Sequence, residues 1–165
     1  DRVASRGLGD VYKRQVPEAL GGLGISPTAF CKICEILATA NGSTAWCIFT
    51  GATSQSLFGA LPTSQLQKML QNPDVITSGV FADSGTALFE EREGQAGYVI
   101  NGHWRWGSGC RNAQWISGGI HEVDGSGETV TDAPRLTRVF FQPDEIELVD
   151  NWHVSGMRGL SLIHI

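Results

Sequence analysis

Residues 98–115 read YVINGHWRWGSGCRNAQW, and this segment decides the fold. Its first three residues alternate between two faces, as in a strand. Asn101-Gly102 follows, and this pair is the strongest short-range hairpin signal because both turn positions need positive φ. Trp104 and Trp106 are two residues apart, which predicts that they share one face of a strand over residues 103–108. The segment therefore predicts a β-hairpin that turns at Asn101-Gly102.

The predicted second strand ends in Gly107-Ser108-Gly109, one hydroxyl between two residues without side chains. Glycine lets a flat ligand approach the backbone closely, and serine offers a hydrogen-bond donor. An aromatic wall beside such a backbone suits a planar heteroaromatic cofactor. A core strand with a glycine bulge explains the same spacing, so both interpretations stay open on the residues alone.

The segment resembles the middle-domain signature of the acyl-CoA dehydrogenase superfamily, and it is most similar to the flavin-dependent monooxygenase branch. That branch reads Gly-x-Trp-x-Phe-x-Ser-Gly-Cys-x-His-Ala-x-Trp. The matching positions here are Gly102, Trp104, Trp106, Ser108, Gly109, Cys110, Ala113 and Trp115. Asn112 stands where the branch often has His. Residues 41–47, NGSTAWC, and 152–159, WHVSGMRG, resemble two further motifs of the family in the same order.

The resemblance implies a flavin site on eight residues. The backbone of Val80, Phe81 and Ala82 is expected at the pyrimidine edge of the flavin, with Ser84 and Gly85 near its ribityl chain or phosphate. Ser108 is expected at the flavin N5 edge, with Trp106 and Gly107 beside it. No catalytic residue is assigned, because Asn112 cannot act as the base that His would supply. No metal site is expected.

The function implied is that of a monooxygenase using reduced FAD or FMN to hydroxylate a small aromatic substrate through a flavin C4a-hydroperoxide. A flavin reductase partner and a homotetrameric full-length protein are implied with it. An acyl-CoA dehydrogenase proper is the alternative, disfavoured by the missing Thr-Glu-Pro motif and by Trp104, where dehydrogenases have Lys. A non-catalytic β binding domain is the other alternative.

Composition narrows the class of protein further. The net charge of −5 and pI of about 5.3 give no basic surface, so nucleic acid is not an expected partner. No apolar run approaches the roughly 18 residues that a membrane helix needs. Four cysteines without a disulfide framework fit a reducing cytoplasm. Cys31-x-x-Cys34 lies in a helical pattern, so these cysteines are predicted to be small buried helix residues rather than metal ligands.

The chain is predicted to be α+β, with N-terminal helices followed by an antiparallel β-barrel or sandwich. Residues 1–15 and 160–165 match nothing in the family and are expected to be non-native. Residues 16–73 are expected to form a partial N-terminal helical domain and residues 74–159 a flavin-binding β middle domain, with a C-terminal helical domain missing. The first helix is predicted to be capped by Ser26 and to end at Asn41-Gly42; the second, capped by Ser43, and a short third extend over residues 43–59 and 62–71. Strands are predicted over residues 75–82, 86–91, 95–100, 103–108, 115–123, 136–142 and 145–149.

Overall fold

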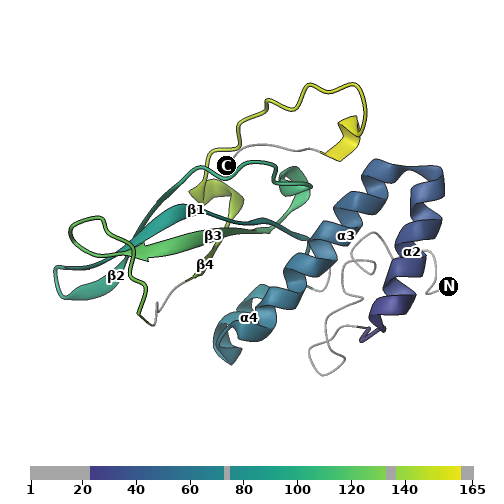
Figure 1. The fold of residues 1–165 in the computed structure, drawn as a ribbon. Coiled ribbons are helices and arrows are strands. Elements are labelled where there is room, and N and C mark those ends of the chain that lie inside the picture. Colours follow the sequence, from purple (N-terminus) through teal and green to yellow (C-terminus); the bar gives the residue numbers. More distant parts are fainter. Residues whose placement is uncertain (1–22, 73–74, 133–136, 161–165) are drawn as a thin grey trace.

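A computed structural model describes residues 23–72, 75–132 and 137–160 (Figure 1). Helices come first along the chain and strands second, which confirms the α+β prediction. The predicted leader, residues 1–15, lies outside the described residues, as does all of the predicted tail except Leu160. The helices are α2 (Pro27–Ala40), α3 (Gly42–Ser56) and α4 (Thr63–Met69), and the strands are β1 (Thr77–Arg92), β2 (Gln95–Gly102), β3 (Trp115–Val123) and β4 (Arg138–Phe141).

The first two helices meet at a single asparagine. Ser26 caps α2 as predicted, because its hydroxyl accepts a hydrogen bond from the Ala29 amide at 3.2 Å. Asn41 ends α2 and also caps α3, where its side chain accepts from the Thr44 amide at 3.0 Å. The prediction that Ser43 caps the second helix is therefore wrong, because the amide oxygen two residues earlier already occupies that role.

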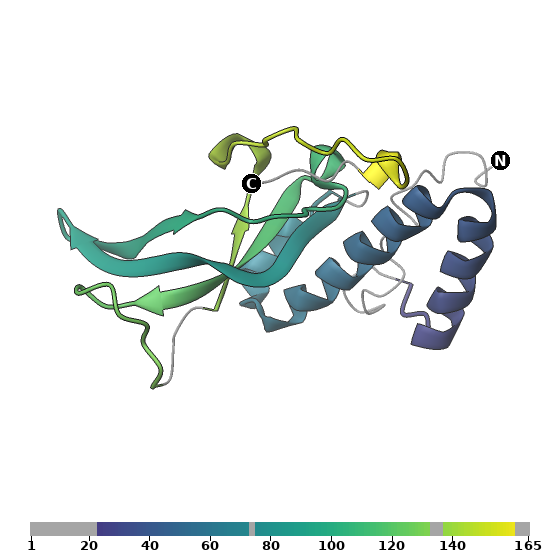
Figure 2. The same cartoon turned by 45° about the horizontal axis from the view of Figure 1, so that its top comes forward.

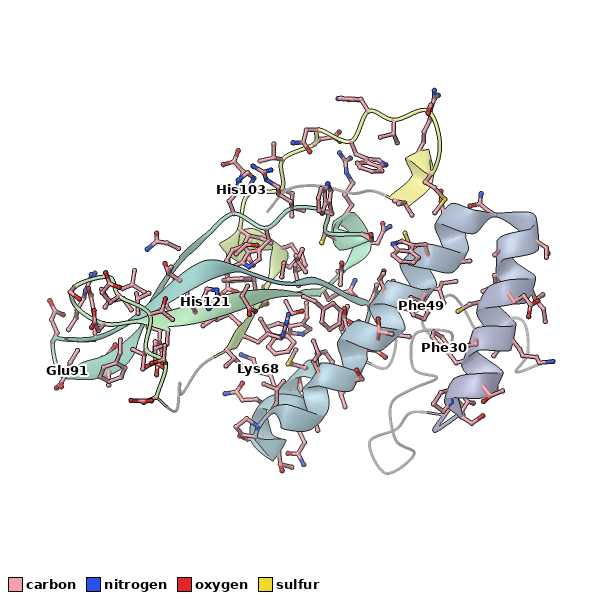
Figure 3. All side chains as sticks on the ribbon, in the orientation of Figure 1. Phe30, Phe49, Lys68, Glu91, His103 and His121 are labelled. Atoms are coloured by element: carbon pink, nitrogen blue, oxygen red, sulfur yellow. The ribbon has the colours of Figure 1, made fainter. Side chains whose placement is uncertain are left out.

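Aromatic rings hold α2 against α3. The rings of Phe30 and Phe49 stack with centroids 6.0 Å apart, and both side chains lie between the two helices (Figure 3). On its other side α3 contacts the start of β1, where the Thr77 hydroxyl donates to the Gly51 carbonyl at 2.9 Å. The helical pair and the sheet are thus joined through α3. The cysteine prediction is wrong for Cys31, which is exposed on α2 because the apolar face contains Phe30 instead.

The four strands form one open, curled, mixed sheet in the order β2-β1-β3-β4 (Figure 2). β1 pairs with β2, and β3 with β4, in antiparallel fashion, but β1 pairs with β3 in parallel. The prediction of a purely antiparallel domain is therefore wrong. It assumed that parallel neighbours need a helical crossover. Here β2 returns the chain along the outer side of β1, and residues 103–114 then cross to its other side.

The hairpin turn between β1 and β2 lies at Glu93-Gly94, with φ of 54° and 76°. Asn101-Gly102 is not a turn: these are the last two residues of β2, paired with Thr86 and Gly85. Positive φ at both turn positions is what a two-residue hairpin needs, and Glu-Gly supplies it here. The predicted location of the hairpin is wrong.

Residues 103–108 do not form a strand, and the two tryptophans do not share a face. Trp104 is 3% exposed, whereas Trp106 is 66% exposed and has a φ of 66°. The left-handed backbone at Trp106 breaks the alternation on which the prediction rested. Trp104 is therefore a core residue, and only Trp106 faces outward.

Trp104 packs against a surface of glycines. Its indole N–H donates to the Gly119 carbonyl at 2.7 Å, and the Phe141 ring lies 5.5 Å away, centroid to centroid. A Cβ atom on Gly118 would lie 2.6 Å from Cε2 of this ring, and one on Gly102 would lie 2.5 Å from Cη2. The glycines of this sheet therefore make room for the indole.

Four other strand predictions need correction. Residues 77–82 and 86–91 belong to the single long strand β1 instead of two strands, and residues 75 and 76 precede it. Residues 145–149 are not a strand, because Pro143–Glu145 form a 3₁₀ turn closed by a capping box between Gln142 and Glu145. Of the strand predicted over residues 136–142, the described part forms a strand only over Arg138–Phe141, which is β4. Among the described residues, no helix is long and apolar enough to cross a bilayer.

Candidate functional site

A bulge interrupts the long strand β1 where the resemblance predicts the flavin-binding strand and turn. The register between β1 and β3 shifts twice between Val80 and Gly85, so that Phe81, Ala82 and Ser84 have no partner on β3. Pairing with β2 begins only at Gly85. Bulges of this kind re-aim side chains and free backbone groups beside functional sites. The strand continues through this point, so the predicted break between the strands at residues 75–82 and 86–91 is wrong.

Arg138 lies against this bulge, and the sequence analysis did not identify it. Its guanidinium donates to the Val80 carbonyl at 2.9 Å and to the Phe81 carbonyl at 3.2 Å. It also lies 5.1 Å from the centre of the Phe81 ring. Burial lowers the pKa of Arg138, while the charge of Asp83 raises it. The only signal in the sequence was a single basic residue at the start of the apolar run RVFF.

Ser108 is held from two sides. Its side chain is 6% exposed, and its Oγ accepts a hydrogen bond from the indole N–H of Trp46 on α3 at 3.1 Å. Its carbonyl accepts a hydrogen bond from the Ser78 hydroxyl on β1. Ser108 is thus the point where the helical pair and the sheet meet. Trp46 is not a core residue, because its ring is 46% exposed and its indole N–H is bonded to the predicted site.

The direction of the hydrogen bonds behind Ser108 follows from the number of protons available. The Ser78 hydroxyl has one proton and donates it to the Ser108 carbonyl. Its other contact, to Cys110 Sγ at 3.1 Å, therefore uses the thiol proton of Cys110. Burial raises the pKa of Cys110 to about 11, although the hydrogen bond to Ser78 opposes this effect. At neutral pH Cys110 is therefore a protonated donor and not a nucleophile.

This arrangement predicts a loss of stability in alkali. The folded-state pKa of Cys110 is raised above its ordinary value of 9.0, so its stabilising effect is complete below pH 9 and is lost as the pH rises through about 11. We expect the free energy of unfolding to fall by about 2 kcal/mol from this thiol over that range. Urea unfolding at several pH values should show a shallower fall in Cys110→Ala than in the wild type.

Cys31→Ala is the matched control for that experiment, because it removes an exposed thiol on α2. It should leave the alkaline fall in place. A smaller fall will persist in Cys110→Ala, since burial also raises the pKa of Cys47. Identical pH dependence in Cys110→Ala and the wild type would contradict the assignment.

The structure brings the three resemblance motifs together around Ser108. The Gly109 amide donates to the carbonyl of Leu160 at 2.8 Å, and Leu160 is the residue directly after the third motif. Cys47 of the first motif lies 3.5 Å from the same carbonyl through its Sγ. Figure 1 shows the segment from β4 to residue 160 running over the sheet to the start of α3. Motifs far apart in sequence are therefore neighbours.

The eight predicted flavin contacts fall into two groups. Four are exposed, and four are buried or nearly so. The exposed residues are Phe81, Ala82, Ser84 and Trp106, and the buried ones are Val80, Gly85, Gly107 and Ser108. The Val80 side chain belongs to the core, and Gly85 lies under the Trp104 ring. Of the buried residues with side chains, Ser108 alone has a hydroxyl to offer.

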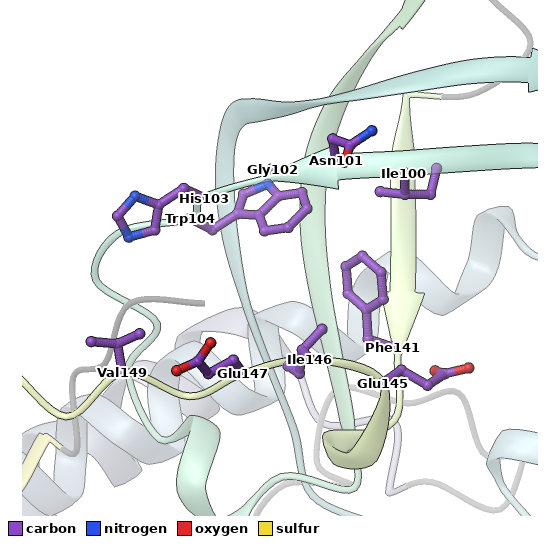
Figure 4. A pocket seen from close by; sticks show the side chains of 10 residues that line it. All are labelled: Ile100, Asn101, Gly102, His103, Trp104, Phe141, Glu145, Ile146, Glu147 and Val149. Carbon is purple, nitrogen blue, oxygen red and sulfur yellow. The ribbon is translucent and has the colours of Figure 1, made fainter.

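A separate cleft of about 370 Å³ opens beyond Trp104 at the end of β2 (Figure 4). Trp104, Phe141 and Ile146 line it with apolar side chains, and His103 and Glu147 contribute polar ones. None of the eight predicted flavin contacts lines this cleft. His103 and His121 are both exposed. Among the described residues, no three His, Cys, Asp or Glu side chains group as metal ligands do.

No family model matches the chain. Indole-3-acetate monooxygenase of Acinetobacter baumannii is 31% identical over 151 residues, which cover 90% of this chain and 36% of that protein. The oxygenase component of the FADH2-dependent resorcinol hydroxylase of Rhizobium sp. is 33% identical over 163 residues, covering 94% of this chain and 36% of the relative. Among solved structures, XiaF from Streptomyces sp., in complex with FADH2 and glycerol, matches with a TM-score of 0.82 at 24% identity, over 94% of this chain and 37% of its own.

These comparisons confirm the resemblance stated from the sequence. The homologues of this chain are oxygenase components of flavin-dependent monooxygenases, and the solved structure shares its fold. The chain spans about a third of the length of the curated relatives that it matches.

Proposed function

We propose, from these homologues, that the whole protein is the oxygenase component of a two-component monooxygenase that hydroxylates a small aromatic substrate. Reduced FAD or FMN would be its cofactor. The names of the resorcinol hydroxylase and of the XiaF complex give reduced FAD for those two proteins. A flavin reductase would supply the reduced cofactor. We further propose that residues 16–73 and 74–159 are the helical and flavin-binding domains of a cytoplasmic homotetramer.

One observation carries the proposal: Ser108 has a hydroxyl fixed by Trp46, two residues along the chain from the exposed Trp106 ring. The left-handed φ of 66° at Trp106 is unfavourable for a residue with a large side chain, and such strain is concentrated at binding sites. The ring gains little from packing, since it is 66% exposed. A surface tryptophan held in this conformation, two residues before a buried hydroxyl in the sequence, suits a flat ligand with a polar edge. These residues therefore fit a flavin ring.

The fit is poorer at the pyrimidine edge assigned to Val80 and Phe81. Both carbonyls already accept hydrogen bonds from Arg138, so they are not free acceptors. What remains there is the bulge at Ala82 and Ser84, which have no register partner on β3, with the guanidinium of Arg138 bonded to the neighbouring Phe81 carbonyl. Ser78, whose hydroxyl bonds the Ser108 carbonyl, lies on the same strand a few residues before this bulge. The distance along the strand is roughly 10 Å, which is about the length of a tricyclic ring. The bulge and Ser108 therefore suit the two ends of one ligand.

The roles of the chain's own residues follow from this arrangement. A bound reduced flavin supplies the electrons that activate O₂. Ser108 would hold the N5 edge of the ring, and Trp106 would cover a face of it and exclude water. No base is assigned, because Asn112 is exposed and its amide cannot take a proton at neutral pH.

Ser108→Val tests the proposal directly, because it keeps the approximate volume and removes the hydroxyl. We expect the affinity for oxidised FAD or FMN to fall about fivefold, the size of effect that a lost hydrogen bond produces, and the affinity for the reduced form to fall less. Quenching of flavin fluorescence measures the oxidised form, and anaerobic absorbance titration measures the reduced form. In the whole protein, hydrogen peroxide release should rise at the cost of hydroxylated product.

Ser54→Val is the matched control, since Ser54 is 1% exposed and its hydroxyl has no hydrogen-bond partner among the described residues. It should leave flavin affinity unchanged. Equal flavin affinity in Ser108→Val and the wild type would show that Ser108 is a structural residue only. A tightly bound flavin that is bleached by an acyl-CoA thioester would instead indicate a dehydrogenase.

A further inference from the structure

We propose that Trp46 is a positioning residue that turns the Ser108 hydroxyl into an oriented donor for the flavin, an inference that rests on the proposed function. Trp46 lies on α3, in the helical part of the chain, whereas Ser108 follows β2. Their hydrogen bond, 3.1 Å from Nε1 to Oγ, spans 62 residues of sequence. The helical pair would thus take part in flavin binding through this one contact.

Proton counting gives the orientation. An indole N–H can only donate, so Ser108 Oγ is the acceptor of this bond and keeps its own proton. Among residues 23–72, 75–132 and 137–160, no acceptor for that proton is found. The carbonyl of Ser108 is already bonded to Ser78, which fixes the backbone from the opposite side. The hydroxyl proton is therefore free for a ligand, and Trp46 restricts the directions that it can take.

Packing within the helical pair holds Trp46 in place. Its ring stacks on Phe49 with centroids 5.8 Å apart and an interplanar angle of 30°. Phe49 in turn stacks on Phe30 of α2, which is 1% exposed (Figure 3). Trp46 is nonetheless 46% exposed. Because one side of the Trp46 ring is packed and the rest is exposed, the ring can fix the Ser108 hydroxyl without blocking the access of a ligand to it.

The redox state of the flavin makes this role measurable. Oxidised flavin has an unprotonated N5 that accepts a hydrogen bond, whereas reduced flavin carries a proton there and donates one. An oriented Ser108 O–H therefore favours the oxidised form. Trp46→Phe keeps an aromatic ring and removes the N–H, so we expect affinity for oxidised FAD to fall about three- to tenfold. Affinity for reduced FAD should change less than twofold, a difference that a general packing defect would not produce.

A double-mutant cycle in the 165-residue chain tests whether Trp46 acts through Ser108. If it does, adding Trp46→Phe to Ser108→Ala should change oxidised-FAD affinity by less than twofold, because Ser108→Ala has already removed the hydroxyl through which Trp46 acts. Additive losses would overturn the inference. Thr39→Val is the control: it removes another side-chain hydrogen bond of the helical pair, from the exposed Thr39 hydroxyl on α2 to the Ile36 carbonyl at 2.6 Å. It should leave affinity unchanged.

Nuclear magnetic resonance tests the hydrogen bond without flavin. The five tryptophans give five indole N–H signals, and Trp46→Phe identifies one of them by its loss. In the wild type this signal should exchange with water more slowly than that of Trp106, and Ser108→Ala should remove the protection. Unchanged exchange in Ser108→Ala would refute the inference whatever the flavin result. If protection is lost as expected but Ser108→Ala binds both flavin forms like the wild type, the proposed function fails instead.

Discussion

Trp104→Ala should lower the free energy of unfolding by about 3–5 kcal/mol, the usual cost of truncating a large buried aromatic side chain. Trp104 is 3% exposed, packs against Phe141 and donates its indole N–H to the Gly119 carbonyl. Its removal leaves a cavity over three glycines that have no side chains to fill it, and it leaves that carbonyl without its buried partner. Chemical denaturation at neutral pH measures the loss.

Trp106→Ala is the matched control, two residues along the same segment. This ring is 66% exposed, so its truncation should change the free energy of unfolding by less than about 0.5 kcal/mol. The strained φ of 66° remains in both proteins. If the tryptophans shared one face, as their spacing suggested, the two substitutions would cost similar amounts. Comparable losses would therefore contradict the structure.

The sequence predicted those features that depend on local signals. Ser26 followed by Pro27 predicted the start of α2, and Asn41-Gly42 predicted its end, because capping and termination depend on neighbouring residues. The change from helical to alternating periodicity predicted the α+β class. Turn predictions were wrong where two nearby residue pairs could both form the turn. Asn101-Gly102 is a strong turn pair, yet Glu93-Gly94 makes the turn and leaves it inside β2.

Trp106 shows a limit of periodicity itself. Side chains alternate between two faces only while the backbone stays extended. Nothing in the neighbouring sequence indicates that Trp106 adopts a positive φ. The parallel pairing of β1 with β3 could not be predicted for a different reason. It depends on the path of residues 103–114 around β1, and the residue pattern within either strand does not determine that path.

The sequence predicted where the candidate site lies but not which residues form hydrogen bonds around it. Ser108 was identified from its flanking glycines and the family pattern, and the structure surrounds it with the three motifs. Its partners were not identified, because hydrogen bonds between Trp46 and Ser108 or between Ser78 and Ser108 join distant segments. Arg138 was missed for the same reason, since its carbonyl acceptors lie on a strand 57 and 58 residues away.

Gly118→Ala should cost about 3 kcal/mol, at the upper end of what an extra buried methyl group costs in a packed core. The new Cβ would lie 2.6 Å from Cε2 and 2.8 Å from Nε1 of Trp104. The indole cannot retreat easily, because it also packs closely against Gly85 and Gly102. Gly125→Ala is the control, since a Cβ there meets no atom within 4 Å. It should be close to neutral in the same denaturation measurement.

The clash at Gly118 involves only the Trp104 side chain among its nearest atoms, so a smaller side chain at position 104 should relieve it. Trp104→Leu combined with Gly118→Ala should therefore be more stable than the sum of the two single losses predicts. Residues in contact typically show coupling of about 0.5–3 kcal/mol, and we expect a favourable value near the upper end. Additive losses would mean that the methyl group strains the β3 backbone instead. Favourable coupling would show that glycine is needed at this position to make room for the indole.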